Sequence, residues 1–90
     1  EDPVTHTDPR LYIKVFPNPA TRILFVESRR NVAKPIFYQL YDITGRLMLT
    51  GDSIKDKFEI NVERLTPGVY SLKLYNGRDI GLMTEKIIIH

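Results

Sequence analysis

The chain has 90 residues, no cysteine, 42% hydrophobic residues and a formal net charge of +2. A chain of this length makes one small domain, and without cysteine it has neither a disulfide framework nor a thiolate metal site. Its cations are scattered among the carboxylates, which gives little support to nucleic-acid binding, and no apolar run approaches the roughly 18 residues of a membrane span.

Residues 1–10 contain two prolines, three acids and no hydrophobic periodicity. This composition indicates a linker or disordered lead-in, to which a larger protein would be attached. A short apolar strand over 11–16 follows and stops at Pro17-Asn18-Pro19. Because proline lacks a backbone donor and restricts the residue before it, this tripeptide predicts a rigid corner outside any central strand. The folded domain is expected to cover residues 11–90.

The next segments read as three strands joined by polar connections. Residues 22–27 are apolar on both faces, which predicts the most enclosed strand of the domain. Residues 36–42 and 46–50 form a predicted hairpin whose turn has Gly45 in the left-handed conformation. A polar connection over 51–57 follows.

Apolar and polar residues alternate over 58–62, which predicts a half-buried strand. It leads into a turn that begins at Leu65 and has Gly68 at a corner where a positive φ is expected. In the strand that follows, Tyr70 lies on the inward face. A Leu and a turn just before such a Tyr suit a tyrosine corner, in which the hydroxyl bonds back to upstream backbone.

Asn76-Gly77 predicts another hairpin, but a strict two-residue turn would place Asp79 on the apolar face, so we expect a longer or bulged loop through Gly81. A last strand over 83–89 completes seven short strands, and no segment shows helical periodicity. The predicted class is all-β, and the strand count favours a seven-stranded antiparallel immunoglobulin-like β-sandwich over a closed barrel.

The search for catalytic chemistry finds little. His6 and His90 lie in the lead-in and at the last residue, which are poor places to hold a base against a nucleophile. Asp42 could pair with Glu27 or Glu59 as a carboxylate dyad, but a turn-capping Asp and two solvated carboxylates are the more ordinary interpretation. No phosphate loop, zinc spacing or calcium loop occurs. We therefore predict no enzyme activity, no catalytic residue, no metal site and no cofactor.

Besides the prediction of no enzyme activity, two interpretations of the sequence as a binding module stay open. Arg29-Arg30 with Lys34 could contact phosphate or anionic carbohydrate, although a solvated loop is the more ordinary reading. The tyrosines could form a sugar-stacking platform, although in strands they more often pack in the core or across strands; they are Tyr12, Tyr38, Tyr41, Tyr70 and Tyr75. An immunoglobulin-like adhesive or carbohydrate-binding module is therefore the alternative function.

Four short motifs occur in a fixed order along residues 11–90. They are Phe16-Pro17-Asn18-Pro19-Ala20, Asp42-Ile43-Thr44-Gly45-Arg46, Leu65-Thr66-Pro67-Gly68-Val69-Tyr70 and Glu85-Lys86-Ile87-Ile88-Ile89-His90. Taken together, they resemble the type IX secretion C-terminal sorting domain, which closes many surface and secreted proteins of Bacteroidetes such as gingipains. The resemblance gives the motif residues a structural role; these are Pro17, Asn18, Pro19, Asp42, Gly45, Leu65, Gly68 and Tyr70.

The resemblance implies that the domain is a sorting signal and not a catalyst. Cargo attached at its N-terminal side would enter the periplasm by an ordinary signal peptide and then pass the outer membrane through the type IX translocon to the cell surface or the exterior. In the family, a sortase-like cysteine peptidase commonly removes the domain and the cargo is joined to anionic lipopolysaccharide. The cut is expected within residues 1–10, and the nucleophile would belong to the partner.

The family's tail pattern falls on Lys86, Ile88 and His90, which the resemblance assigns to recognition by the secretion machinery. His90 departs from the final basic residue of the family, since histidine is partly charged near neutral pH. An Ile exposed between two cations is an unusual surface. A terminal strand at a sheet edge would also carry unpaired backbone groups that invite strand addition or a homodimer. The alternative is that the tail merely completes the sandwich.

Overall fold

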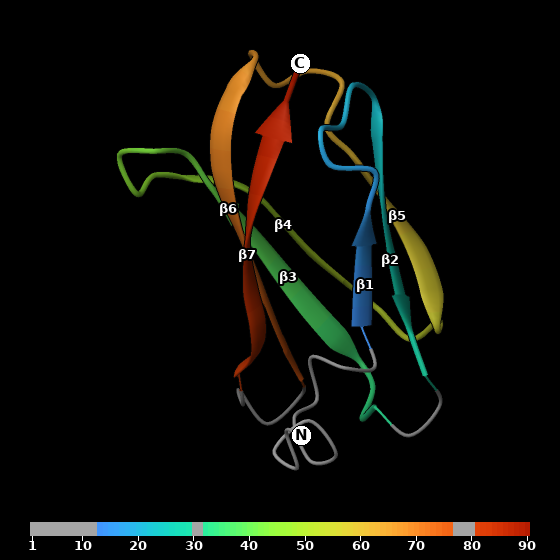
Figure 1. Ribbon diagram of the computed structural model, residues 1–90. Coiled ribbons are helices and arrows are strands. Elements are labelled where there is room, and N and C mark those ends of the chain that lie inside the picture. The colour runs from blue at the N-terminus through green and yellow to red at the C-terminus, as the bar shows by residue number, and fades with distance from the viewer. Residues whose placement is uncertain (1–12, 30–31, 77–80) are drawn as a thin grey trace, which may run out of the picture.

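The structure is a computed structural model that describes residues 13–29, 32–76 and 81–90, and its strands form two sheets that face each other (Figure 1). The bounds of the strands are β1 Ile13–Phe16, β2 Ile23–Ser28, β3 Ile36–Tyr41, β4 Leu47–Ser53, β5 Lys57–Asn61, β6 Gly68–Asn76 and β7 Gly81–Ile89. No helix in these described ranges could span a membrane. The predicted lead-in, residues 1–10, lies outside the described residues.

The strands divide into a three-stranded sheet with the order β1-β2-β5 and a four-stranded sheet with the order β4-β3-β6-β7. All paired strands are antiparallel, which confirms the all-β class and the two-sheet sandwich. In a constant-type immunoglobulin domain the fourth strand joins the sheet of the first two, whereas here β4 pairs with β3. The immunoglobulin-like assignment stays a prediction.

The core lies between the two sheets and is built from alternate residues of the strands. On β6, Tyr70, Leu72 and Leu74 are buried, whereas Lys73 is exposed on the other face, as the alternation predicted. The largest fully buried side chains are Leu24, Ile36, Leu40, Ile60, Leu72, Leu74, Ile87, Val26 and Val62. These residues come from both sheets, so each sheet buries one face against the other.

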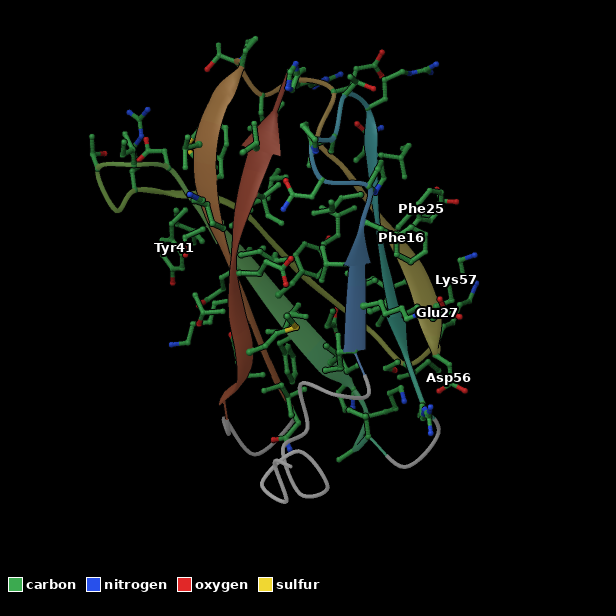
Figure 2. All side chains as sticks on the ribbon, viewed as in Figure 1. Phe16, Phe25, Glu27, Tyr41, Asp56 and Lys57 are labelled. Atoms are coloured by element: carbon green, nitrogen blue, oxygen red, sulfur yellow. The ribbon has the colours of Figure 1, made fainter. Side chains whose placement is uncertain are left out.

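β2 was predicted to be the most enclosed strand, but only its inner face is covered. Leu24 and Val26 are buried, but the alternate residue Phe25 is half-buried on the outer face of the three-stranded sheet. There its ring stacks on that of Phe16 at a centroid distance of 5.5 Å, and Lys57 Nζ lies 5.3 Å from its centroid (Figure 2). The apolar outer residues of β2 therefore pack against cross-strand neighbours and not beneath a further layer.

The end of β4 differs from the sequence prediction, whereas the bulge before β7 agrees with it. β4 continues past Thr50 to Ser53, because Gly51 to Ser53 pair with the first half of β3. The polar composition of these residues had indicated a connection and not a strand. The ladder between β6 and β7 has a register shift next to Gly81, in agreement with the predicted bulge. The turn itself, residues 77–80, lies outside the described residues.

The first and last strands, β1 and β7, point in the same direction (Figure 1). β1 begins at Ile13, at one end of the sandwich, and β7 finishes at the other end. Just past β1, Ala20 forms an isolated parallel bridge with Ile89. This bridge connects the two sheets at the end where β7 finishes.

Candidate recognition surface

The side chains of the tail alternate between core and solvent as predicted. Ile87 and Ile89 are buried, whereas Lys86, Ile88 and His90 are exposed. The buried pair anchors the strand in the core, and the outward three lie on the outer face of the four-stranded sheet. The tail therefore both completes the sandwich and displays side chains, so the two interpretations of its role are not exclusive.

The backbone at this end of β7 is not open, although β7 is an edge strand. Asn18 Nδ2 donates to the Lys86 carbonyl at 2.8 Å, and Ile88 N–H donates to Asn18 Oδ1 at 2.9 Å. Ala20 N–H donates to the Ile88 carbonyl at 2.8 Å, and His90 N–H donates to the Ala20 carbonyl at 2.9 Å. The prediction of an unpaired edge is therefore wrong for the tail, and a homodimer through this edge would have to displace these bonds.

This edge cap, made by the Asn18 side chain and the Ala20 backbone, explains the motif Pro17-Asn18-Pro19-Ala20. Neither proline has an N–H with which to pair, so the carboxamide of Asn18 provides the donor and acceptor that a strand backbone would have provided. Sequence reasoning predicted the corner correctly but missed this function. The sequence feature that could have indicated this role is an Asn between two prolines, neither of which has a backbone N–H to donate.

The turn before β6 is a tyrosine corner. Tyr70 is buried, and its hydroxyl donates to the Thr66 carbonyl at 2.6 Å. Leu65 is half-buried against the core. Gly68 has a φ of 158°, so the positive φ predicted for it is present, and it is the first residue of β6. The predicted hydroxyl bond of Tyr70 is also confirmed.

The β3–β4 turn is organised by Asp42. Its Oδ1 accepts hydrogen bonds from Thr44 Oγ1 at 2.6 Å, Thr44 N at 2.9 Å and Arg46 N at 3.0 Å. The Thr44 hydroxyl, then the Arg46 N–H, holds the pKa of Asp42 below its usual value, because each bond favours the ionised carboxylate. Gly45 has a φ of 90°, the predicted left-handed conformation. Asp42 is therefore a turn residue.

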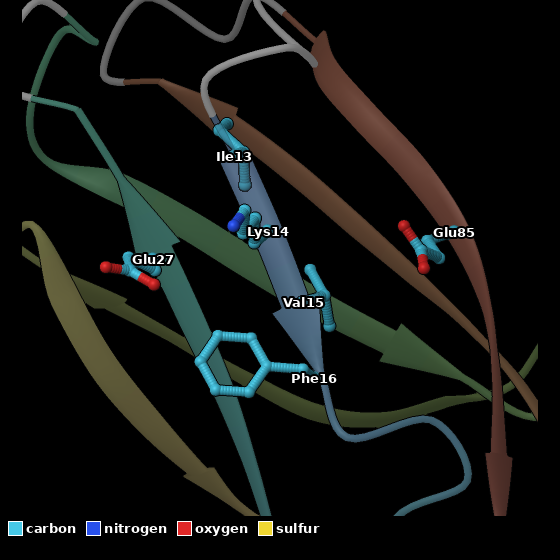
Figure 3. Close-up of a pocket in the computed structure, with 6 residues that line it drawn as sticks. All are labelled: Ile13, Lys14, Val15, Phe16, Glu27 and Glu85. Atoms are coloured by element: carbon cyan, nitrogen blue, oxygen red, sulfur yellow. The ribbon is translucent and has the colours of Figure 1, made fainter.

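Among the described residues, Asp42 is not brought together with either of its candidate partners, Glu27 and Glu59. Glu27 and Glu59 lie on the three-stranded sheet, whereas Asp42 lies in a turn of the other sheet. An open groove of about 550 Å³ beside β1 is lined by Glu27 and Glu85, but these side chains lie on opposite sides of β1 (Figure 3). Among the described residues no group of His, Cys, Asp or Glu could hold a metal ion.

The remaining binding candidates are also dispersed. Lys34 Nζ donates to the Val32 carbonyl at 3.0 Å in its own loop and forms an ion pair with Asp56 Oδ1 at 2.8 Å, which joins this loop to the β4–β5 connection. Of the tyrosines, Tyr38 and Tyr70 pack toward the core, whereas Tyr41 and Tyr75 lie on the outer face of the four-stranded sheet. His6, Tyr12 and Arg30 lie outside the described residues. No sugar-stacking platform forms from the tyrosines that the structure describes.

Comparison with known proteins decides the family. The model of the secretion system C-terminal sorting domain matches residues 14–90. The chain belongs to this family. Its members are the sorting signals of type IX secretion, which confirms the resemblance read from the four motifs, and the adhesive alternative is not favoured.

This sorting domain is also similar in fold to one part of a solved protein, the type IX secretion component PorZ of Porphyromonas gingivalis. The TM-score is 0.72 at 18% sequence identity, and the match covers 92% of this chain and 12% of the PorZ chain. At this identity the likeness concerns the fold alone, and the chain spans a small part of the length of PorZ. No curated protein matches the sequence.

Proposed function

We propose that this sorting domain directs a cargo joined ahead of β1 through the periplasm to the type IX translocon, and that the machinery recognises the outward side chains of Lys86, Ile88 and His90. The observation that carries the proposal is the fixed display of these side chains. Ile87 and Ile89 anchor the strand from inside, and the edge cap holds its backbone from the side.

The same geometry favours side-chain recognition over strand addition. A peptide that adds to a sheet edge binds through backbone N–H and C=O groups. At Ile88 both of these groups are already bonded, to Asn18 and Ala20. A partner that read the outer face would leave these bonds intact, whereas strand addition would have to replace them.

The later steps belong to the partners. We propose that a sortase-like cysteine peptidase removes the domain by a cut within residues 1–10 and that the cargo reaches the cell surface or the exterior. The domain supplies no chemistry of its own in this scheme. Membership of the sorting-domain family supports it.

The test is a fusion of residues 1–90 to a periplasmic reporter in a Bacteroidetes host. Deletion of 86–90 would also remove Ile87, Ile89 and the partners of the edge cap, so it would test folding as well as recognition. Lys86→Glu and Ile88→Ser change exposed side chains alone. We expect the wild-type fusion on the surface and both variants retained in the periplasm, with unchanged melting. Normal export of both variants would refute the recognition role.

A further inference from the structure

Exposed apolar side chains gather at one end of the four-stranded sheet. Among the described residues five large hydrophobic side chains are exposed: Ile43 at 82%, Ile54 at 76%, Leu47 at 46%, Val69 at 42% and Ile88 at 37%. Ile54 lies in the β4–β5 connection. The other four lie in the β3–β4 turn, at the start of β4, at the start of β6 and near the end of β7, which meet at the same end of the sheet (Figure 1).

The strand register makes these residues neighbours on the outer face. Val69 pairs with Ile88 across β6 and β7. Tyr41 pairs with Leu47 on one side and with Ser71 on the other, which places it diagonal to Val69. Tyr41 projects away from the three-stranded sheet (Figure 2). The register therefore joins Tyr41, Leu47, Val69 and Ile88 into one surface, the outer-face patch.

We infer that the outer-face patch is a single docking surface for a protein partner that presents an apolar face with acidic residues around it. The inference rests on the proposed function and extends it, because the tail residue Ile88 becomes one edge of a surface that reaches across the sheet to β4. Contiguous exposed apolar surface of this kind marks interaction sites. Because Val69 pairs with Ile88, the exposed side chains of the tail are continuous with the rest of the outer-face patch.

The charges around the patch define the chemistry of the partner. Lys86 and His90 flank Ile88 along β7, and both are exposed. The carboxylate of the adjoining turn, Asp42, is already paired with Arg46 at 3.3 Å. The Lys86 ammonium therefore makes this edge of the patch cationic, which favours an acidic partner. A second copy of the domain would present the same cation, so it is the less complementary occupant.

The patch is also held in shape before any partner binds. Tyr41 Oη donates to Gln39 Oε1 at 2.7 Å on the same face, which fixes the ring. The β3–β4 turn is closed by the bonds to Asp42, and β7 is held by the edge cap. A preformed surface loses little conformational entropy on binding, so a few apolar contacts at its centre would contribute most of the affinity.

The test compares matched charge insertions in the reporter fusion. Val69→Glu and Leu47→Glu place an acid within the patch, whereas Ile54→Glu makes the same change at an exposed isoleucine elsewhere. We expect surface delivery to fall by about tenfold or more for the two patch variants, with melting temperatures like that of Ile54→Glu, which should export normally. Val69→Thr, which keeps the β-branched shape, should have a smaller effect.

The outcomes separate this inference from the proposed function. If Val69→Glu and Leu47→Glu export normally while Ile88→Ser is retained, the patch is not a docking surface but the tail is still recognised. If Lys86→Glu and Ile88→Ser also export normally, the proposed function fails as well. Flotation of the purified chain with phosphatidylglycerol vesicles tests a membrane as the occupant. We expect no binding, and vesicle binding that Val69→Glu abolishes would overturn the assignment to a protein.

Discussion

The carboxamide oxygen of Asn18 accepts a hydrogen bond from the Ile88 N–H at 2.9 Å, across 70 residues of sequence. The amide of the same side chain donates to the Lys86 carbonyl at 2.8 Å. One side chain therefore replaces a segment of neighbouring strand along the edge of β7. The PNPA motif is explained by this replacement, since the turn alone would not require an Asn.

Asn18→Ala removes both bonds at once. We expect the free energy of unfolding to fall by about 1 to 2 kcal/mol, because each typical hydrogen bond contributes roughly 1 kcal/mol net. We also expect faster amide hydrogen exchange at Ile88, measured by NMR. Asn61→Ala is a matched control, because Asn61 Oδ1 bonds locally to Glu63 N. Unchanged exchange at Ile88 in the Asn18 variant would contradict the edge cap.

Tyr70→Phe tests the corner before β6. The substitution removes the 2.6 Å bond to the Thr66 carbonyl, and we expect a loss of about 1 kcal/mol of stability, because it leaves that acceptor without its buried partner. Tyr75→Phe is the control, since the Tyr75 hydroxyl makes no hydrogen bond within the described ranges. Equal urea midpoints for wild type and Tyr70→Phe would show that the hydroxyl bond contributes nothing to stability.

Gly51 is required by the side chain opposite it. A Cβ at this position would overlap the ring of its register partner Tyr38, with 2.6 Å to Cζ. The Tyr38 ring is held by stacking on Phe58 at 6.0 Å, so we expect Gly51→Ala to destabilise by about 1 to 3 kcal/mol through overpacking. The cost should shrink in a Tyr38→Leu background. A double-mutant cycle without coupling would contradict this contact.

The turn at Asp42 predicts a pH dependence of stability. Because the folded pKa of Asp42 lies below its ordinary value of 3.8, the contribution of the carboxylate is present above that value and is lost as pH falls through the folded pKa. Asp42→Asn should therefore lower the melting temperature near neutral pH, and the difference from wild type should shrink in acid. Asp52→Asn, at an exposed carboxylate on β4, should change little. A difference that is constant with pH would exclude this linkage.

His90 predicts an effect on export without an effect on folding. The His90 side chain is exposed, and the family's tail pattern has a basic residue at this position, so His90→Lys should raise reporter delivery if a lysine here improves recognition. His90→Gln should lower it. Both variants should melt like wild type, because the cap bond at this residue uses the backbone N–H. Equal export by wild type, His90→Lys and His90→Gln would show that the His90 side chain is not part of the recognition surface.

The sequence allowed prediction of features that depend on short-range pattern. The alternation around Tyr70 and Ile87 identified inward faces, and Gly45 identified the hairpin turn. The edge cap could not be predicted, because it joins Asn18 to Ile88 and local periodicity carries no information about such distant pairs. The outer-face patch depends on the register of Tyr41 with Leu47, next to a bulge in the β3–β4 ladder, and one residue of slip would have moved Leu47 off that face.

Ile13 and the end of β7 lie at opposite ends of the sandwich. The first described strand therefore begins at the end of the sandwich opposite the tail side chains that we propose a receptor binds. Cargo proteins of very different size and charge could be attached ahead of β1 without covering these side chains. One receptor could then bind many different secreted proteins, because the side chains it would contact lie away from the attached cargo.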